Sequence, residues 1–212
     1  MSRAIVTFAV GADYRRLLDI ALPTFAVFAD RHDYDLIVAD VPAQPRPPSW
    51  WKIPAIQAAL GDGYDEVLYL DADVVIVDPS RDLEVPFGYW QALVEHHTQD
   101  GAVPNCGVWM LRPPMLNELE RIWTMIRYLN HGWWEQAALC ELLGYTGRPL
   151  AHTQTTELYE NTCFLDPGWN VHRDDVRAPD HVRIQHATMW PNRAGIMRQW
   201  AEHSHQAAGV PA

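Results

Sequence analysis

Short apolar runs and amphipathic segments alternate along the first part of the chain. Residues 3–10 are rich in β-branched and aromatic side chains and end at Gly11, which predicts a buried strand. Apolar side chains then recur at helical spacing over residues 14–28, and Pro23 is expected to kink or divide that helix. Residues 34–39 predict a second strand, so the segment has the strand–helix–strand order of a parallel unit.

The same order repeats once more before the pattern changes. A helix is predicted over residues 51–60 and a third buried strand over residues 66–70. Together these elements predict an α/β fold with a mixed, mostly parallel sheet flanked by helices. Beyond residue 78, two strands at residues 91–95 and 107–111 are expected to be joined through a polar loop.

The last part of the chain contains two predicted helices and little other regular structure. Residues 116–129 have the apolar spacing of an amphipathic helix, and a second helix is predicted over residues 134–143. Residues 152–184 are expected to be irregular, with strand candidates at residues 162–165 and 182–184.

Composition and charge narrow the class of protein. With 48% hydrophobic and 20% charged residues, the 212-residue chain has the composition of a globular domain. It has no run of about 18 apolar residues and its N-terminus lacks the features of a signal peptide, so we expect no membrane span and a cytoplasmic location. A net charge of −11 repels nucleic acid, which is therefore not an expected partner. The three cysteines are widely spaced, which predicts neither a disulfide framework nor a cysteine metal site.

The most informative feature is a pair of aspartates, Asp71 and Asp73, directly after the strand predicted at residues 66–70. In open α/β sheets, ligands bind outside the carboxyl ends of the strands. Alternation also places two side chains two residues apart on the same side of an extended segment. A similar pair, Asp33 and Asp35, lies instead at the entrance of a strand. The first pair is therefore the candidate site.

Two carboxylates this close repel each other and gain from a shared cation. Mg²⁺ and Mn²⁺ are hard cations that suit carboxylate and phosphate oxygens. The alternative is a turn that carries two solvated aspartates, and the letters Asp-x-Asp alone would favour it. The position directly after a buried strand favours the metal site.

The segment Tyr69-Leu70-Asp71-Ala72-Asp73 resembles the Asp-x-Asp motif of GT-A glycosyltransferases, especially families 8 and 34. Further segments resemble motifs of these families in the same order along the chain: Trp50–Pro54, Asn105–Arg112, Trp134–Leu139, Phe164–Asn170 and His186. The similarity extends over about residues 3–193. The sequence departs from the family pattern in two places. Glu135 stands where aspartate is usual, and the Gly and Lys that follow the histidine in family 8 are not in register, since residues 190–193 follow instead with Arg193 one place late.

This resemblance implies a single GT-A domain, the Rossmann-like fold of nucleotide-diphospho-sugar transferases. Residues 1–78 would bind the nucleotide, residues 79–200 would bind the sugar and the acceptor, and residues 201–212 are expected to be a fraying tail. The implied activity is metal-dependent transfer of a sugar, with retention of configuration, from a nucleotide-sugar donor to a hydroxyl acceptor. A UDP-sugar is the expected donor, and the acceptor is a small molecule, glycan or protein that the sequence does not identify.

The resemblance also implies roles for individual residues. Mn²⁺ or Mg²⁺ would be bound by Asp71, Asp73 and His186. The residues implied to contact the nucleotide are Gly11, Asp13, Tyr14, Lys52, Asp71 and Arg193. The candidate catalytic residues, which would hold the donor sugar or face its reacting carbon, are Asn105, Glu135 and Gln136. The tryptophans that are candidates for an acceptor surface, with core filling as the alternative, are Trp133, Trp134, Trp169 and Trp190.

Each of these residues also has a simpler alternative role. Tyr14 suits the buried face of a helix, and Asn105 suits a turn. Lys52 would be a solvated charge, although a cation at a helix start opposes the helix dipole and favours a bound anion. Glu135 would stabilise the start of its helix without any substrate. His186 would be a core or surface histidine.

Two other function classes stay open from the sequence. Sugar-phosphate nucleotidyltransferases have a similar sheet but use a glycine-rich, basic loop after the first strand, whereas residues 10–15 contain one glycine. A non-catalytic module that binds a sugar or nucleotide is the second alternative. The intact pair Asp71 and Asp73, together with Glu135, argues for an active enzyme.

Overall fold

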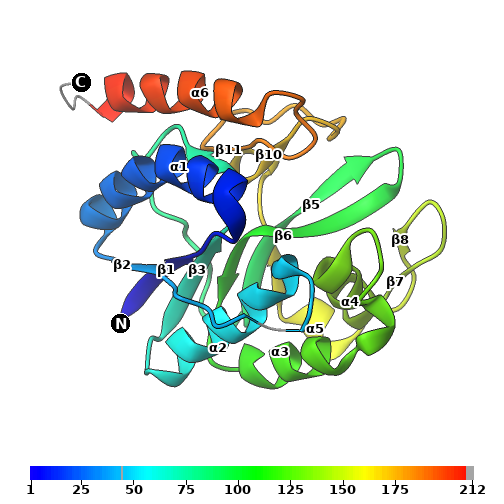
Figure 1. Ribbon diagram of the computed structural model, residues 1–212. Helices are drawn as coiled ribbons and strands as arrows, with labels where there is room; N and C mark the ends of the chain where they lie inside the picture. The colour runs from blue at the N-terminus through cyan, green and yellow to red at the C-terminus, as the bar shows by residue number, and fades with distance from the viewer. Residues whose placement is uncertain (44, 209–212) are drawn as a thin grey trace.

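A six-stranded mixed sheet forms the centre of the computed structural model, which describes residues 1–43 and 45–208 (Figure 1). Its strands lie in the order β2-β1-β3-β6-β5-β9. Their bounds are Arg3–Thr7 (β1), Asp35–Val38 (β2), Glu66–Leu70 (β3), Gln91–Thr98 (β5), Gly101–Leu111 (β6) and Thr162–Phe164 (β9). β1 pairs in parallel with β2 and β3, and β5 with β9, whereas β6 runs antiparallel to β3 and β5. The predicted α/β fold with a mixed, mostly parallel sheet is confirmed.

Helices cover both faces of this sheet, with α1 and α6 on one face and α2, α3 and α4 on the other (Figure 1). The helical elements are α1 (Gly11–His32), η1 (Pro48–Trp51), α2 (Lys52–Gly61), α3 (Met115–Thr124), η2 (Ile126–Tyr128), α4 (Trp134–Leu142), α5 (Glu157–Glu160), η3 (Pro167–Trp169) and α6 (Arg193–Ala208). Because side chains alternate along a strand, Leu68 and Leu70 of β3 pack toward α1, and Val67 and Tyr69 pack toward α2. No helix among the described residues combines the length and apolarity needed to cross a membrane.

A second sheet brings the C-terminal region to the aspartate pair. It consists of β10 (Val171–His172), β11 (Ile184–His186) and β4 (Val74–Ile76). β11 runs antiparallel to β4 with His186 opposite Val74, and the amide of Ala187 donates to the backbone oxygen of Asp73 at 2.8 Å. The strand that follows Asp73 therefore holds His186 beside it. A separate hairpin is formed by β7 (Tyr145–Thr146) and β8 (Ala151–His152).

Several helix boundaries differ from those predicted. α1 runs through Pro23 without a break, because the apolar side chains on both sides of the proline are buried in one core. α3 ends at Thr124, earlier than predicted, and a short 3₁₀ turn follows it. Residues 201–208, expected to fray, continue α6, while residues 209–212 of the predicted tail lie outside the described residues.

The hairpin of β5 and β6 is longer than predicted. Residues 96–106 were expected to contain a polar loop, but the two strands stay paired as far as Thr98 and Gly101. His96 and Val103 are buried in this extension. The alternation of polar and apolar side chains is poor here, so tertiary packing rather than local pattern determines the strands.

Arg112 connects the end of β6 with the loop that precedes β5. Its Nε and Nη2 donate to Glu66 Oε2 at 3.2 and 3.0 Å. The same guanidinium donates to the backbone oxygens of Val85, Pro86 and Tyr89. Both partners of the ion pair are largely buried, so each depends on the other to satisfy its charge.

We expect Arg112→Met to lower the free energy of unfolding by about 3 kcal/mol or more, because Glu66 would remain buried without its cation. Arg121 provides the control, since its pair with Glu118 lies on an exposed helix surface. Arg121→Met should cost less than about 1 kcal/mol. Urea denaturation of both variants measures the difference, and equal losses would contradict the structural role of Arg112.

Candidate functional site

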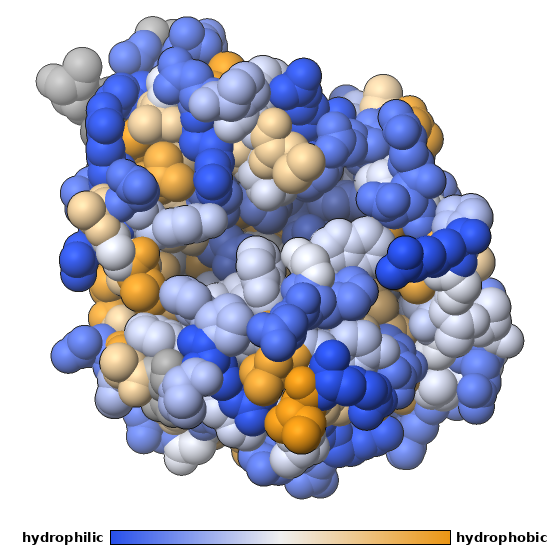
Figure 2. Space-filling view, turned by 45° about the vertical axis from the view of Figure 1, so that its right-hand side comes forward, coloured by the Kyte–Doolittle hydropathy of each residue, from blue (hydrophilic) through white to orange (hydrophobic). Residues whose placement is uncertain are grey.

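A cavity of about 1450 Å³ opens at the carboxyl ends of β1 and β3. Residues 8–10, which follow β1, and residues 71–73, which follow β3, line it together with parts of the β5–β6 hairpin, the start of α4 and the segment after β11. The space-filling view shows this face hollowed, with hydrophilic and intermediate side chains around the opening (Figure 2). The aspartate pair thus lies where α/β sheets bind ligands.

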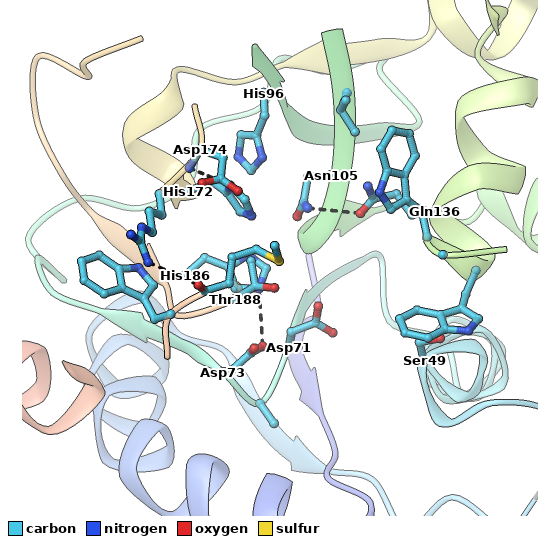
Figure 3. A pocket seen from close by; sticks show the side chains of 18 of the residues that line it. Ser49, Asp71, Asp73, His96, Asn105, Gln136, His172, Asp174, His186 and Thr188 are labelled. Carbon is cyan, nitrogen blue, oxygen red and sulfur yellow. Dashed lines mark hydrogen bonds and ion pairs between the residues drawn. The ribbon is translucent and has the colours of Figure 1, made fainter. Parts of the chain in front are cut away.

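Asp71, Asp73 and His186 meet on one wall of the cavity (Figure 3). One ligand atom from each lies within 4.8 Å of the others, and Asp73 Oδ1 is 3.4 Å from His186 Nε2. The side chains of Asp73 and His186 are almost completely buried. The structure therefore brings together the three residues that the sequence predicted as metal ligands.

Gly107 of β6 makes this close approach possible. A Cβ added at this position would lie 2.5 Å from His186 Cε1 and 3.0 Å from both Asp71 Oδ2 and Asn105 Oδ1. Any side chain here would push the three groups apart. The close packing explains physically why the segment Asn105–Arg112 has a glycine at position 107.

Asp73 is stabilised as a carboxylate by two basic neighbours. Arg193 Nη1 lies 3.1 Å from Asp73 Oδ2 and 3.1 Å from the hydroxyl of Tyr14. Burial by itself would raise the pKa of Asp73, but His186 and Arg193 together hold that pKa below its ordinary value. Arg193 therefore compensates part of the repulsion expected between the two aspartates.

Lys52, the only lysine of the chain, is buried between two carboxylates. Its Nζ lies 3.0 Å from Asp71 Oδ1 and 3.1 Å from Glu135 Oε1. Burial opposes the charge of Lys52, but Asp71, Cys106 and Glu135 outweigh it and raise the pKa of Lys52 well above its ordinary value. The alternative of a solvated charge at the helix start is wrong for this residue.

The residues predicted to face the donor sugar lie together on an adjoining wall of the cavity. Asn105 Nδ2 donates to Gln136 Oε1 at 3.1 Å (Figure 3). Asn105 Oδ1 accepts from the amide of Gly107 at 2.9 Å. Glu135 Oε2 is buried and has no hydrogen-bond partner among the described residues. The hydroxyl of Ser49, which also lines the cavity, lacks a partner in the same way.

Sequence reasoning missed the roles of Asn170 and His172, two polar residues that lie close to this wall. Asn170 is fully buried and its backbone oxygen accepts from His96 Nε2 at 2.7 Å. His96 and His172 pack ring to ring at 4.9 Å, and both line the cavity. Burial and His172 lower the pKa of His96 to about 3, while burial and His186 lower the pKa of His172 to about 4. Only Asn170 carried a pattern that pointed to it, because it ends the segment Phe164–Asn170 of the resemblance.

The remaining predicted residues divide between the cavity and its surroundings. Tyr14 lines the cavity and is 43% exposed, whereas Gly11 and Asp13 do not belong to its described lining. The predicted tryptophans that line it are Trp133, Trp134 and Trp190. Trp169 lies outside the cavity, where its ring packs against Arg183.

The strand order, the cavity and the aspartate pair define the GT-A fold of glycosyltransferases, so the predicted fold is confirmed. No family model and no curated protein matches the sequence. A glycosyltransferase involved in the glycosylation of the major capsid of PBCV-1 superposes on 97% of this chain and 100% of its own length, with a TM-score of 0.67 and 16% identity.

Two other solved glycosyltransferases show the same fold. The galactosyltransferase LgtC, in complex with donor and acceptor sugar analogs, is 15% identical, covers 98% of this chain and 97% of its own, and has a TM-score of 0.58. GlyE of Streptococcus pneumoniae TIGR4 is 14% identical over 96% of this chain, with a TM-score of 0.63. This chain spans only 60% of that GlyE chain.

Replacing Lys52 tests the buried charge arrangement. We expect Lys52→Met to lower the free energy of unfolding by about 3–5 kcal/mol, because Glu135 would be left as a buried carboxylate without a cation. The double variant Lys52→Met/Glu135→Gln should recover part of this loss in urea denaturation. A double variant no more stable than Lys52→Met would contradict the pairing.

Stability should fall as the pH drops from about 6.5 toward 4. In the unfolded chain His96 and His172 take up protons near pH 6.5, whereas in the folded protein they stay neutral down to their lowered pKa values of about 3 and about 4. The unfolded state therefore binds more protons, which lowers the free energy of unfolding by up to about 1.4 kcal/mol per pH unit for each histidine. In urea denaturation at pH 7 and pH 5, His96→Asn should lose less stability than the wild type; an equal loss would disprove the assignment.

Proposed function

We propose that this protein is a metal-dependent glycosyltransferase that moves a sugar from a nucleotide-sugar donor to a hydroxyl acceptor. The observation that carries the proposal is the meeting of Asp71, Asp73 and His186 in a large cavity at the carboxyl end of β3. The GT-A fold supports it, since the solved proteins that share this fold are glycosyltransferases. A UDP-sugar donor, retention of configuration and a cytoplasmic location complete the proposal.

The three residues fit a divalent cation. Two ligands that meet at right angles about 2.1 Å from a metal ion are about 3 Å apart, and Asp73 Oδ1 lies 3.4 Å from His186 Nε2. Two carboxylates and one imidazole suit Mn²⁺ better than Mg²⁺, which prefers oxygen ligands alone. When bound, the cation would supply charge neutralisation for the departing nucleoside diphosphate.

The basic residues around the metal ligands would have separate tasks. Lys52 is locked between Asp71 and Glu135, so it would hold the carboxylates in place and contact phosphate only through them. Arg193 has a side chain that is 37% exposed, and its only ion pair in the described structure is with Asp73. This guanidinium can therefore turn from Asp73 to the diphosphate once a metal ion takes over the carboxylate. Tyr14, which Arg193 contacts, would pack beside the nucleotide near Gly11 and Asp13.

The other wall would hold the sugars. Glu135 Oε2 lacks a partner among the described residues and would accept a hydrogen bond from a hydroxyl of the donor sugar. Gln136 and Asn105 lie beside it. Trp133 and Trp134 border the same part of the cavity and would stack on the acceptor, whose identity as a small molecule, glycan or protein the proposal leaves open.

We expect UDP to bind only together with a divalent cation. Without one, the diphosphate would meet Asp71 and Asp73 in a protein of net charge −11. Calorimetry with Mn²⁺ and with EDTA tests this, and equal affinities would refute the proposal. Asp73→Asn should abolish the Mn²⁺-dependent binding, whereas Asp33→Asn, which changes the other aspartate pair outside the cavity, should leave it intact. Slow Mn²⁺-dependent hydrolysis of a UDP-sugar would separate an enzyme from a binding module.

His186→Ala should weaken Mn²⁺-dependent UDP binding by at least about tenfold, or roughly 1.4 kcal/mol, because one metal ligand is lost. The matched control is His181→Ala, since His181 is exposed and pairs with Asp78 away from the cavity. His172 is unsuitable as a control because its ring packs against His186. If both alanine variants bound UDP with the same affinity, His186 would not be a ligand.

A further inference from the structure

Asn170 is a fully buried amide that contacts three residues of the cavity wall without lining the cavity itself. Its Nδ2 lies 2.8 Å from Asn105 Oδ1, and its Oδ1 lies 3.1 Å from His186 Nδ1. Its backbone oxygen lies 2.7 Å from His96 Nε2. One side chain therefore connects the metal-ligand wall with the wall that would hold the donor sugar.

A backbone amide fixes the direction of these hydrogen bonds. The N–H of Gly107 can only donate, so the Asn105 atom that lies 2.9 Å from it must be the oxygen. The same oxygen faces Asn170, which must therefore present its NH₂ group to Asn105 and its oxygen to His186. An amide oxygen can only accept, so Nδ1 of His186 must carry a hydrogen. Amide and imidazole orientations that are usually ambiguous are thus determined by one peptide group.

We propose that Asn170 is a positioning residue that keeps a hydrogen on Nδ1 of His186 and thereby leaves Nε2 as the metal-binding atom. Nε2 is the nitrogen that faces Asp73, at 3.4 Å. A hydrogen bond from the non-ligating nitrogen is what orients metal-binding histidines in general and makes the other nitrogen a better ligand. The metal part of this inference rests on the proposed function, whereas the position of the hydrogen does not.

Asn170, Asn105 and Gln136 form a hydrogen-bonded chain of amides that extends to the wall that would hold the donor sugar. Asn105 has its oxygen occupied by Gly107 and Asn170, so its NH₂ group donates to Gln136 Oε1 at 3.1 Å. Gln136 accepts that bond with its oxygen, which leaves its own NH₂ group for an oxygen atom of a ligand. Asn170 therefore sets the orientation of His186 and, through Asn105, supports that of Gln136.

Nitrogen NMR of the metal-free protein, labelled with ¹⁵N-histidine, tests the position of the hydrogen at about pH 8, above the ordinary histidine pKa. His186→Gln assigns the signals by removing one set. In the wild type we expect His186 to carry its hydrogen on Nδ1 and His96 to carry its hydrogen on Nε2. Asn170→Ala should shift His186 toward the Nε2–H form. A wild-type His186 with its hydrogen on Nε2 would overturn the inference, even if Asn170→Ala did not fold.

Titration with Mn²⁺ alone, followed by electron paramagnetic resonance, tests the consequence for the metal. Asn170→Ala should weaken Mn²⁺ binding by about 10–100-fold. Asn170→Asp keeps an acceptor for His186 but loses the donor to Asn105, so it should restore the Nδ1 hydrogen and part of the affinity. Unchanged Mn²⁺ affinity in Asn170→Ala would refute the positioning role. A wild type that binds no Mn²⁺ but has the expected hydrogen on Nδ1 would contradict the proposed function and support the orientation of His186.

Asn105→Asp separates the two halves of the chain of amides. The carboxylate still accepts from Gly107 and Asn170, so the hydrogen on His186 and the Mn²⁺ affinity should stay unchanged. It has no hydrogen to donate to Gln136, so binding of a UDP-sugar should weaken relative to binding of UDP. Loss of Mn²⁺ affinity in this variant would show that the orientation of His186 does not depend on Asn170 alone and would overturn the proposed division.

Discussion

Three carboxylates lie close to the carboxyl end of β3, and the site is organised around them: Asp71 and Asp73 follow the strand, and Glu135 comes from the start of α4. The side chains of Asp73 and Glu135 are almost completely buried. An ionised carboxylate that is removed from water costs several kcal/mol unless a cation or hydrogen-bond donors compensate it. Lys52 compensates Asp71 and Glu135, and Arg193 compensates Asp73. Because these partners come from α2 and α6, on opposite faces of the sheet, the site can form only when both layers of helices are in place.

Lys52 and Arg193 differ in their freedom to move. Lys52 therefore has a structural role, whereas Arg193 is available to a ligand. Lys52 is buried and has carboxylates on two sides, so moving it would leave Glu135 uncompensated. Arg193 begins α6 at the edge of the cavity and shares its guanidinium between Asp73 and Tyr14. A ligand that supplies its own positive charge to Asp73 can release Arg193 at little cost. The arrangement thus suits the joint binding of a cation and an anion.

The site residues that lie next to each other in the sequence could be predicted from it. Those that tertiary pairing brings in from far along the chain could not. The buried strand before Asp71 and Asp73 has a clear apolar pattern, and its position implies the carboxyl edge of a sheet. His186 was identified through a resemblance, because the pairing of β11 with β4 that places it leaves no pattern in the spacing of residues. Asn170 and His172 were not assigned a role in the site for the same reason. The extension of the β5–β6 hairpin was missed because tertiary packing outweighs its weak alternation.

The amides around the cavity are paired before any ligand is present, whereas two buried oxygens that line it are not, and this contrast identifies where a ligand gains most. Asn170 donates to Asn105, Asn105 donates to Gln136, and the backbone amide of Gly107 sets the direction of both bonds, so these side chains need no reorganisation when a substrate enters. Glu135 Oε2 and Ser49 Oγ line the same cavity but have no partner among the described residues. A buried acceptor without a donor costs about 1–3 kcal/mol, which a correctly placed hydroxyl recovers on binding. A site of this kind discriminates strongly against an analogue that lacks the hydroxyl, because the unpaired oxygen then stays unpaired.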